Sequence, residues 1–254
     1  QIASNWAYTS FMPEPVTVNV DYISGDYSLQ NSVNAARLEA RCIAHQGKPW
    51  DLMAWAFSSK WDERSWTTKS VPQLQQEAAI VLALGGGFQA YFQQKRDGSI
   101  GRWQMNLMKE VATFCRDRQE FCHHAEAVPQ IALVYPGKTF YRKTTRVFAP
   151  WKGELDAMRG ALQSLLDAQY SVEILMEHHL AGRMADYPPI IVPEWDYLEP
   201  AFREELLAYV RDGGNLLVIG PKAAALFADE LQVTLGEMQE DVIHWLEYNN
   251  WLAA

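Results

Sequence analysis

A long apolar run, KPWDLMAWAF from Lys48 to Phe57, is the most prominent hydrophobic feature of the chain. Its bulky residues and the turn residues that flank it predict a buried parallel strand covered on both faces. In α/β barrels the loops that follow the strands build the active site. The residues that end or follow this strand are therefore candidates by position: Trp55, Ser58, Trp61, Asp62 and Glu63.

Strand and helix patterns alternate through the first half of the sequence. Residues 5–15, rich in proline and aromatic side chains, predict a loop, and the alternating valines after them predict a strand. Ser70, followed by Pro72 and Gln73, is typical of a helix start, and the glycine run at 85–87 ends that helix. The predicted strands are 16–23, 48–57 and 88–92, and the predicted helices are 31–45, 70–84 and 103–121. This order gives three consecutive βα units.

At residues 122–129 the alternation of strand and helix patterns is interrupted by a segment that includes His, Ala, Glu and Pro. This segment predicts a linker between two domains, 1–125 and 126–254. Beyond the linker, short apolar strands again alternate with amphipathic helices. Such repeats predict a parallel sheet with helices on both faces. The predicted strands are 131–136, 171–176, 189–192 and 215–219, and the predicted helices are 151–169, 178–184, 201–211, 221–231 and 241–251.

Composition narrows the range of partners. The chain has 254 residues, 48% of them hydrophobic, and a formal net charge of -9 with a pI near 5.2. An acidic chain argues against nucleic acid as a partner, and no apolar run approaches the roughly 20 residues that span a bilayer, so we expect neither nucleic acid nor membrane. The first residue is Gln1 rather than Met, which indicates a start that was processed, trimmed or cut from a longer chain.

The aromatic and cysteine residues carry weaker signals. Ten tryptophans and eleven tyrosines suit the stacking of sugar rings, although core packing is the commoner role of any single one. Cys115 and Cys122 are seven residues apart on a predicted helix, roughly 10 Å, which is too far for a disulfide. We therefore expect these two thiols and that of Cys42 to be free.

Carboxylates at the end of the first predicted strand are the main candidates for chemistry. Asp21, Asp26 and Tyr27 lie there, where a carboxylate can act as acid, base or nucleophile in glycoside cleavage. This chemistry needs two carboxylates roughly 5 to 9.5 Å apart, so the partner would be Glu63, Asp62 or a residue outside this chain. The alternative is that Gly-Asp is a turn and Asp21 a cap.

Each of three further sets of residues has both a functional and a structural interpretation. Gln89, Tyr91 and Gln93 alternate along a predicted strand and could contact a ligand or serve as hydrogen-bonding groups of the core. The residues 193–196, Pro-Glu-Trp-Asp, follow a strand and predict either ligand binding or packing between domains. Adjacent histidines, as at 123–124 and 178–179, diverge on a helix, so we expect no metal site.

Two parts of the sequence resemble multidomain glycoside hydrolases of the α-L-fucosidase and family 42 β-galactosidase type. VDYISGDYS, ARLEARCIAHQGKPWDLMAWAF and QEAAIVLALGGGFQAYFQ look like the last three βα units of a catalytic TIM barrel. YPPIIVPEWDYLEPAFREELLAYVRDGGNLLVIGP is similar to the β-galactosidase trimerisation domain, which has a class I glutamine amidotransferase-like, flavodoxin-like fold. In this resemblance the run KPWDLMAWAF is the seventh of eight barrel strands.

The resemblance implies an α/β fold: C-terminal βα units of a TIM barrel, then a flavodoxin-like or amidotransferase-like parallel-sheet domain. It implies glycoside hydrolysis of a terminal sugar such as fucose or galactose, without a cofactor, and slightly favours a periplasmic or secreted location. Earlier barrel strands would come from outside the chain. Asp26 would be the general acid/base, and the substrate-binding candidates are Asp21, Tyr27, Trp55, Trp61, Glu63, Gln89 and Tyr91.

The second domain departs from true amidotransferases, because its strand-turn-helix at residues 216–227 holds Gly-Pro-Lys where a nucleophile would stand. Glutamine hydrolysis is therefore not expected, and self-association into a homo-oligomer is. The alternative to an enzyme is a non-catalytic carbohydrate-binding or oligomerisation module.

Overall fold

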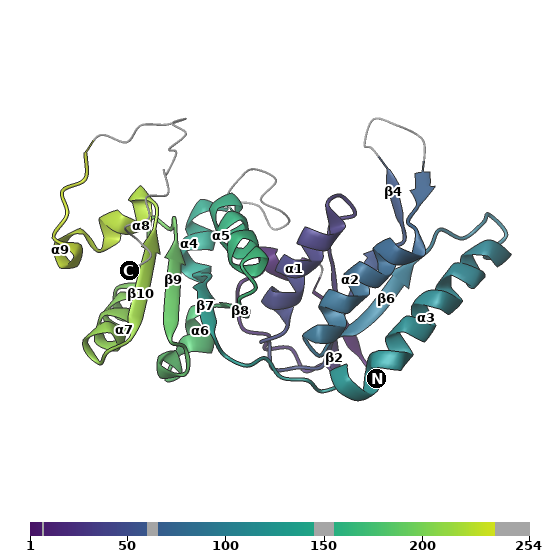
Figure 1. Cartoon of the computed structure of the whole chain (residues 1–254), viewed down its shortest axis with the longest axis horizontal. Coiled ribbons are helices and arrows are strands. Elements are labelled where there is room, and N and C mark those ends of the chain that lie inside the picture. The colour runs from purple at the N-terminus through teal and green to yellow at the C-terminus, as the bar shows by residue number, and fades with distance from the viewer. Residues whose placement is uncertain (7, 60–65, 145–154, 237–254) are drawn as a thin grey trace.

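Two four-stranded parallel sheets lie side by side along the longest axis of the molecule (Figure 1). The computed structural model describes residues 1–6, 8–59, 66–144 and 155–236. Helices follow the strands of both sheets, so the predicted α/β class is confirmed: barrel-like βα units come first and a flavodoxin-like sheet second.

The first sheet has the order β1-β2-β3-β6, and all three pairings are parallel. Its strands are β1 (Ala3–Asn5), β2 (Tyr22–Asp26), β3 (Trp50–Trp55) and β6 (Gly87–Tyr91). Strand β1 falls in a segment without a strand pattern and was not predicted. Within the described residues the sheet has four strands and does not close into a barrel.

The strand predicted at 16–23 was placed too early. Strand β2 begins only at Tyr22, where β1 and β3 offer hydrogen-bonding partners on both sides. Val16 and Val20 instead pack their side chains against the edge of the first core, and Val18 is exposed. The high strand propensity of valine is thus overridden, because within the described residues no strand pairs with this segment before Tyr22.

Three helices cover one face of the first sheet: α1 (Ser32–Ile43), α2 (Val71–Ala83) and α3 (Arg102–Cys122) (Figure 1). Leu52 and Ala54 of β3 point into the core formed with these helices and are fully buried, whereas the alternate residues of β3 are only partly buried. The prediction that this strand is covered on both faces is therefore wrong for the described structure. Side chains alternate along a strand, and the helices lie on one side only.

The start and end of α2 follow the predicted signals. The Ser70 hydroxyl accepts from Gln73 N and the Gln73 side chain accepts from Ser70 N, which forms a capping box. After the helix, Gly85 has a φ of +81°, a conformation that favours glycine. A Cβ on the next residue, Gly86, would collide with the ring of Trp50, so a glycine is needed there for close packing.

A short antiparallel hairpin, β4 (Phe57–Ser59) and β5 (Trp66–Thr68), follows β3 and was not predicted. The sequence suggested a polar loop there.

The second sheet has the order β10-β9-β7-β8, again entirely parallel. Read from β8 and numbered within this sheet, the order is 2-1-3-4, as in flavodoxin-like folds. The strands of this sheet are β7 (Ile131–Val134), β8 (Val172–Leu175), β9 (Pro189–Pro193) and β10 (Asn215–Ile219). The helices in this half are α4 (Gly137–Lys143), α5 (Asp156–Asp167), α6 (Glu177–Leu180), α7 (Pro200–Arg211), α8 (Pro221–Leu226) and α9 (Ala228–Leu231). Two 3-10 turns complete the described elements: η1 (Thr9–Phe11), near the N-terminus, and η2 (Met184–Asp186).

The helix predicted at 221–231 is two short helices, α8 and α9. The helix predicted at 241–251 lies outside the described residues.

Helix α1 joins the two sheets. Its Ala36 and Ala40 belong to the first core, whereas Leu38 and Cys42 belong to the core around the second sheet. Arg41 Nε also donates to the carbonyl of Val172 on β8 over 2.8 Å. One helix thus serves both halves, so its position fixes the strands of the first sheet relative to the second.

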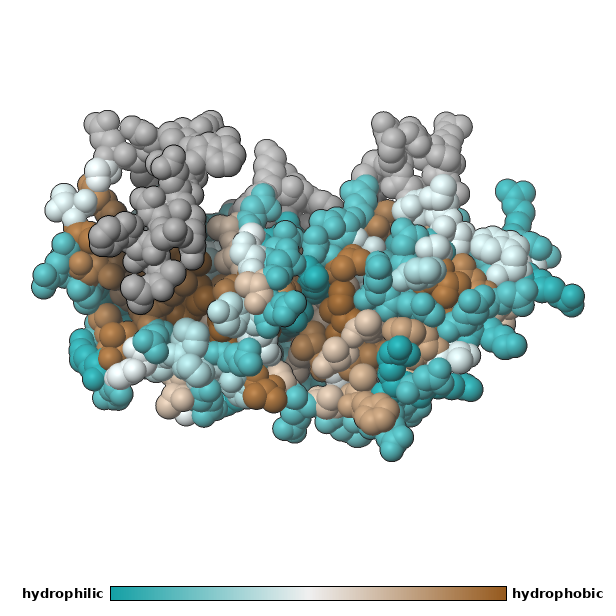
Figure 2. All heavy atoms as spheres, viewed as in Figure 1, coloured by the Kyte–Doolittle hydropathy of each residue, from teal (hydrophilic) through white to brown (hydrophobic). Residues whose placement is uncertain are grey.

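Polar residues cover most of the surface seen in Figure 2, with apolar patches between them. In the part of the chain that the structure describes, no helix is both long and apolar enough to cross a membrane. All three cysteine thiols are free, as predicted.

Candidate functional site

The face of the first sheet opposite the helices carries polar and aromatic side chains. We call it the uncovered face. Strand register aligns Ser24 with Asp51, and Asp26 with Met53 and Gln89, so alternate residues of neighbouring strands share this side. Each of these side chains is partly or fully exposed. The uncovered face consists of Ser24, Asp26, Asp51, Met53, Trp55, Gln89 and Tyr91.

Asp51 lies at the centre of this face and was not singled out from the sequence. Its Oδ1 accepts a hydrogen bond from Ser24 Oγ over 2.6 Å, and its Oδ2 accepts one from Gln89 Nε2 over 2.8 Å. One carboxylate thus links three neighbouring strands. Asp51 precedes Met53 by two residues, so the alternation of β3 places both side chains on the same face. This signal was available in the sequence, but the apolar residues around Asp51 concealed it.

Asp26 ends β2 on the same face. Burial raises the pKa of its carboxyl group above the usual value, and the negative charge of Asp51 raises it further. Strand spacing of about 4.8 Å and a rise of about 3.3 Å per residue put the Cα atoms of the two aspartates roughly 8 Å apart. A carboxyl group with a raised pKa beside a second carboxylate is an arrangement suited to proton transfer.

Tyr8 is a third titratable group near this pair. Burial raises the pKa of its phenol, and the charges of Asp26 and then Glu39 contribute to the increase. The segment before η1 thus brings a tyrosine toward the end of β2, which the sequence did not reveal because residues 5–15 have no periodic pattern.

Aromatic rings gather at the C-terminal ends of β3 and β6. Trp55, Phe57 and Tyr91 contact one another edge to face, with ring centroids 5.5 to 5.7 Å apart. Within the described residues, the buried Nε1 of Trp55 has no hydrogen-bond partner. Tyr91 is 38% exposed. The structure therefore brings three predicted residues, Trp55, Gln89 and Tyr91, to the same face as Asp26.

Other predicted site residues lie elsewhere. Asp21 precedes β2 and accepts a hydrogen bond from Ile2 N over 2.6 Å. It is five residues from Asp26, roughly 17 Å along an extended strand, and lines a groove of about 810 Å³ with Lys48 and Trp50. Trp61, Asp62 and Glu63 lie outside the described residues.

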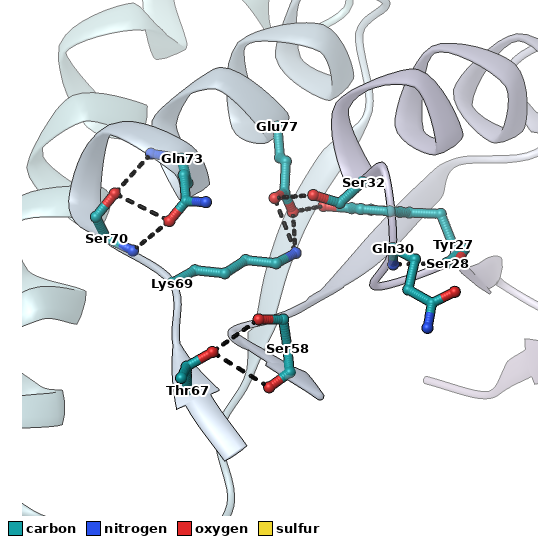
Figure 3. Close-up of polar contacts among 10 residues, drawn as sticks. All are labelled: Tyr27, Ser28, Gln30, Ser32, Ser58, Thr67, Lys69, Ser70, Gln73 and Glu77. Carbon is teal, nitrogen blue, oxygen red and sulfur yellow. Dashed lines mark hydrogen bonds and ion pairs between the residues drawn. The ribbon is translucent and has the colours of Figure 1, made fainter. Parts of the chain in front are cut away.

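Tyr27 points away from the uncovered face, into the layer of helices. Its side chain is fully buried, and its hydroxyl donates to Glu77 Oε2 on α2 over 2.7 Å (Figure 3). The same carboxylate accepts from Ser32 Oγ over 2.6 Å and from Lys69 Nζ over 2.8 and 3.0 Å. Tyr27 therefore contacts a buried ion pair directly behind the site.

The loop that follows β9 is packed against the protein. The Trp195 ring stacks on Tyr135 with centroids 5.7 Å apart, and its Nε1 donates to the carbonyl of Val134 over 2.9 Å. Asp196 pairs with Lys143 over 3.1 Å. These partners all lie in the second half of the chain, so residues 193–196 pack against their own sheet and its helices rather than between the two halves, and ligand binding loses its basis.

The remaining candidates make local contacts. The Gln93 carbonyl accepts from Gln104 Nε2 over 3.3 Å. Among the described residues, no group of three His, Cys, Asp or Glu side chains is placed to hold a metal ion.

Glycoside hydrolases are among the solved structures similar to this chain. The α-L-fucosidase isoenzyme 2 from Paenibacillus thiaminolyticus matches 73% of the chain with a TM-score of 0.60 and 20% identity. The catalytic mutant of Gan42B, a GH42 β-galactosidase from G. stearothermophilus, matches 85% with a TM-score of 0.61 and 13% identity. The exo-β-1,4-mannosidase Op5Man5 from Opitutaceae bacterium strain TAV5 matches 85% with a TM-score of 0.51 and 13% identity.

These similarities establish a glycoside hydrolase-like fold. The chain spans only 27% of the fucosidase, 36% of the galactosidase and 44% of the mannosidase chain. No protein-family model matches the sequence, and no curated protein is a significant match.

Proposed function

We propose that the chain is part of a glycoside hydrolase that acts on terminal sugars of the fucoside or galactoside class. The observation that carries this proposal is the pair of aspartates, Asp26 and Asp51, on the uncovered face of a parallel sheet with a glycoside hydrolase-like fold. In α/β barrels this is the face that points into the barrel, and the active site lies at the C-terminal ends of the strands.

In this mechanism Asp26 is the general acid/base. Glycoside cleavage requires a protonated carboxyl group to deliver a proton to the leaving oxygen, and the raised pKa of Asp26 favours that form. Asp51 lies beside it and, when ionised, makes loss of the Asp26 proton less favourable. The nucleophile or base that completes the pair comes from Asp62, Glu63 or a strand outside the chain.

Substrate binding in this proposal uses the aromatic end of the same face. Trp55 and Tyr91 offer ring faces to a sugar, Tyr91 adds a hydroxyl group, and the exposed side chain of Gln89 offers an amide. Neutral sugars also suit an acidic protein better than polyanions do.

For the second domain we propose a non-catalytic role of the amidotransferase-like, trimerisation type, through which the protein forms a homo-oligomer. The turn between β10 and α8 supports the absence of nucleophilic chemistry at that position. A Cβ on Gly220 would collide with the carboxylate of Glu194, and Pro221 and Lys222 follow, so neither serine nor cysteine stands there.

Hydrolysis of nitrophenyl α-fucosides and β-galactosides tests the enzymatic proposal. We expect Asp26→Asn to lower kcat by roughly 10²- to 10⁴-fold, the usual contribution of general acid/base catalysis. Asp117→Asn, which changes an exposed aspartate on α3, on the other side of the sheet, should leave kcat unchanged. Equal activity of Asp26→Asn and the wild type would remove Asp26 from the mechanism.

The alternative function is a carbohydrate-binding or oligomerisation module. It is favoured by one observation, the open four-stranded sheet, because half a barrel presents only part of an enzyme site. Calorimetric titration with fucose and galactose separates the two functions. Binding without hydrolysis by the wild type supports the module, and Trp55→Ala should then abolish the binding.

A further inference from the structure

A buried ion pair lies directly behind the candidate site. Glu77 of α2 is completely buried, and the Lys69 side chain is 3% exposed. Both carboxylate oxygens of Glu77 accept hydrogen bonds: Oε1 from Ser32 and Lys69, and Oε2 from Tyr27 and Lys69 (Figure 3). Because both oxygens of this buried carboxylate accept hydrogen bonds, each group that donates to it is held in a defined position.

The three donors come from separate segments of the chain. Tyr27 immediately follows β2, Ser32 is the first residue of α1, and Lys69 immediately follows β5. Lys69 is also fixed through its backbone, because its N–H donates to the carbonyl of Ala56 over 2.9 Å, in the residue between β3 and β4. Glu77 therefore connects the C-terminal ends of β2 and β3 to helices α1 and α2.

The connection to the site runs through one peptide bond. Asp26 and Tyr27 are consecutive, and their side chains lie on opposite sides of the sheet: Asp26 on the uncovered face and Tyr27 among the helices. Holding the Tyr27 ring and hydroxyl fixes the backbone that carries the Asp26 carboxyl group. Burial of Tyr27 raises the pKa of its phenol, so the hydroxyl stays protonated and keeps donating to Glu77.

We propose that Glu77 is a positioning residue for Asp26: it acts through the hydroxyl of Tyr27, and Lys69 balances its buried charge. This inference rests on the proposed role of Asp26 in glycoside hydrolysis. It assigns no direct contact with substrate to Tyr27, Lys69 or Glu77.

The test is Tyr27→Phe, which removes the hydroxyl and keeps the ring. Tyr209→Phe is the matched control, because Tyr209 also donates its hydroxyl in the interior, to the Tyr187 carbonyl over 2.7 Å, but belongs to the second domain. The first readout is the pKa of Asp26, measured by carbon-detected NMR titration. We expect it to fall toward the ordinary aspartate value in Tyr27→Phe and to stay at the wild-type value in Tyr209→Phe.

The second readout is steady-state hydrolysis of the nitrophenyl glycosides. We expect Tyr27→Phe to lower kcat by roughly 10- to 100-fold with little change in KM, because misplacing a catalytic group by about 1 Å has effects of that size. The basic limit of its pH profile should move to lower pH with the pKa of Asp26, because activity is lost on that side when the general acid deprotonates. Tyr209→Phe should change neither kcat nor the pH profile, even if it unfolds at a lower temperature.

The two readouts distinguish the positioning role of Glu77 from the proposed hydrolase activity. An inactive wild type with a lowered Asp26 pKa in Tyr27→Phe would refute the enzyme and keep the positioning role. An unchanged or increased Asp26 pKa in Tyr27→Phe would overturn the positioning role whatever the activity. If Tyr27→Phe does not fold, Ser32→Ala, which removes one part-buried partner of Glu77, is measured in the same way and judged by the same outcomes.

Discussion

Asp51 accepts a hydrogen bond from Gln89 Nε2 across two neighbouring strands, over 2.8 Å. Gln89 was a candidate site residue from the sequence, whereas Asp51 was concealed within an apolar run. It also places a negative charge beside Asp26, whose pKa is raised by burial and by that charge.

We predict that Asp51→Asn lowers the pKa of Asp26. The asparagine keeps an oxygen that can accept from Ser24 or Gln89 but removes the charge that opposes ionisation of Asp26. An NMR titration of the Asp26 carboxyl carbon measures the effect, with Asp97→Asn as the control for loss of an exposed charge. Equal Asp26 pKa values in wild type and Asp51→Asn would show that the two groups do not interact.

Glu39 should make stability depend on pH. It lies buried on α1 and accepts hydrogen bonds from Ser10 N, over 2.9 Å, and from the Ser10 hydroxyl. Burial raises its pKa to about 7, from 4.5 in the unfolded chain. Between these values the folded state holds the proton that the unfolded state has released, so the free energy of unfolding falls as pH rises from about 4.5 to about 7.

The size of this effect is on the order of 3 kcal/mol for a fully buried group. Urea unfolding at pH 5 and pH 8 measures it. In Glu39→Gln, which cannot ionise, the difference between the two pH values should shrink by that amount, whereas Glu205→Gln, at an exposed position on α7, should behave as the wild type. A wild-type stability that rises over this interval would contradict the assignment.

Lys69 and Glu77 should be strongly coupled. Lys69→Met leaves the Glu77 carboxylate buried without its counter-ion, which costs about 3–5 kcal/mol of the free energy of unfolding. Glu77→Gln should cost a similar amount by leaving the ammonium group unpaired. Chemical denaturation of the double variant should give less than the sum of the two losses, because the second change removes a charge that is already unpaired. Strict additivity would mean that the two groups contribute independently.

Two glycines should respond in opposite directions to replacement by alanine. In Gly86→Ala the new Cβ collides with the ring of Trp50, so we expect a loss of about 1–3 kcal/mol. In Gly160→Ala, within α5, the Cβ meets nothing within 4 Å, so helix propensity should stabilise the fold by about 0.5–1 kcal/mol. Thermal unfolding of both variants checks the contrast, and a stable Gly86→Ala would mean that Trp50 moves without cost.

Several elements were predictable because their signals are local. The capping box at Ser70 and Gln73 marked the start of α2, and helical spacing marked α1 and α3. The strand 50–55 was recognisable from its apolar run and flanking turn residues. The hairpin of β4 and β5 was missed because its strands are three residues each, too short to show a period.

The sequence by itself determined the alternation of the longer strands and helices, the α/β class and the presence of a carboxylate near the end of the first predicted strand, because periodicity, caps and turn residues act between near neighbours in the chain. Only the tertiary structure decided which residues share a face. It placed Asp51 beside Asp26, turned Tyr27 inward to Glu77 and separated Asp21 from both. Register between distant strands and the side on which helices pack set these relationships, and both arise from contacts between residues far apart in the sequence.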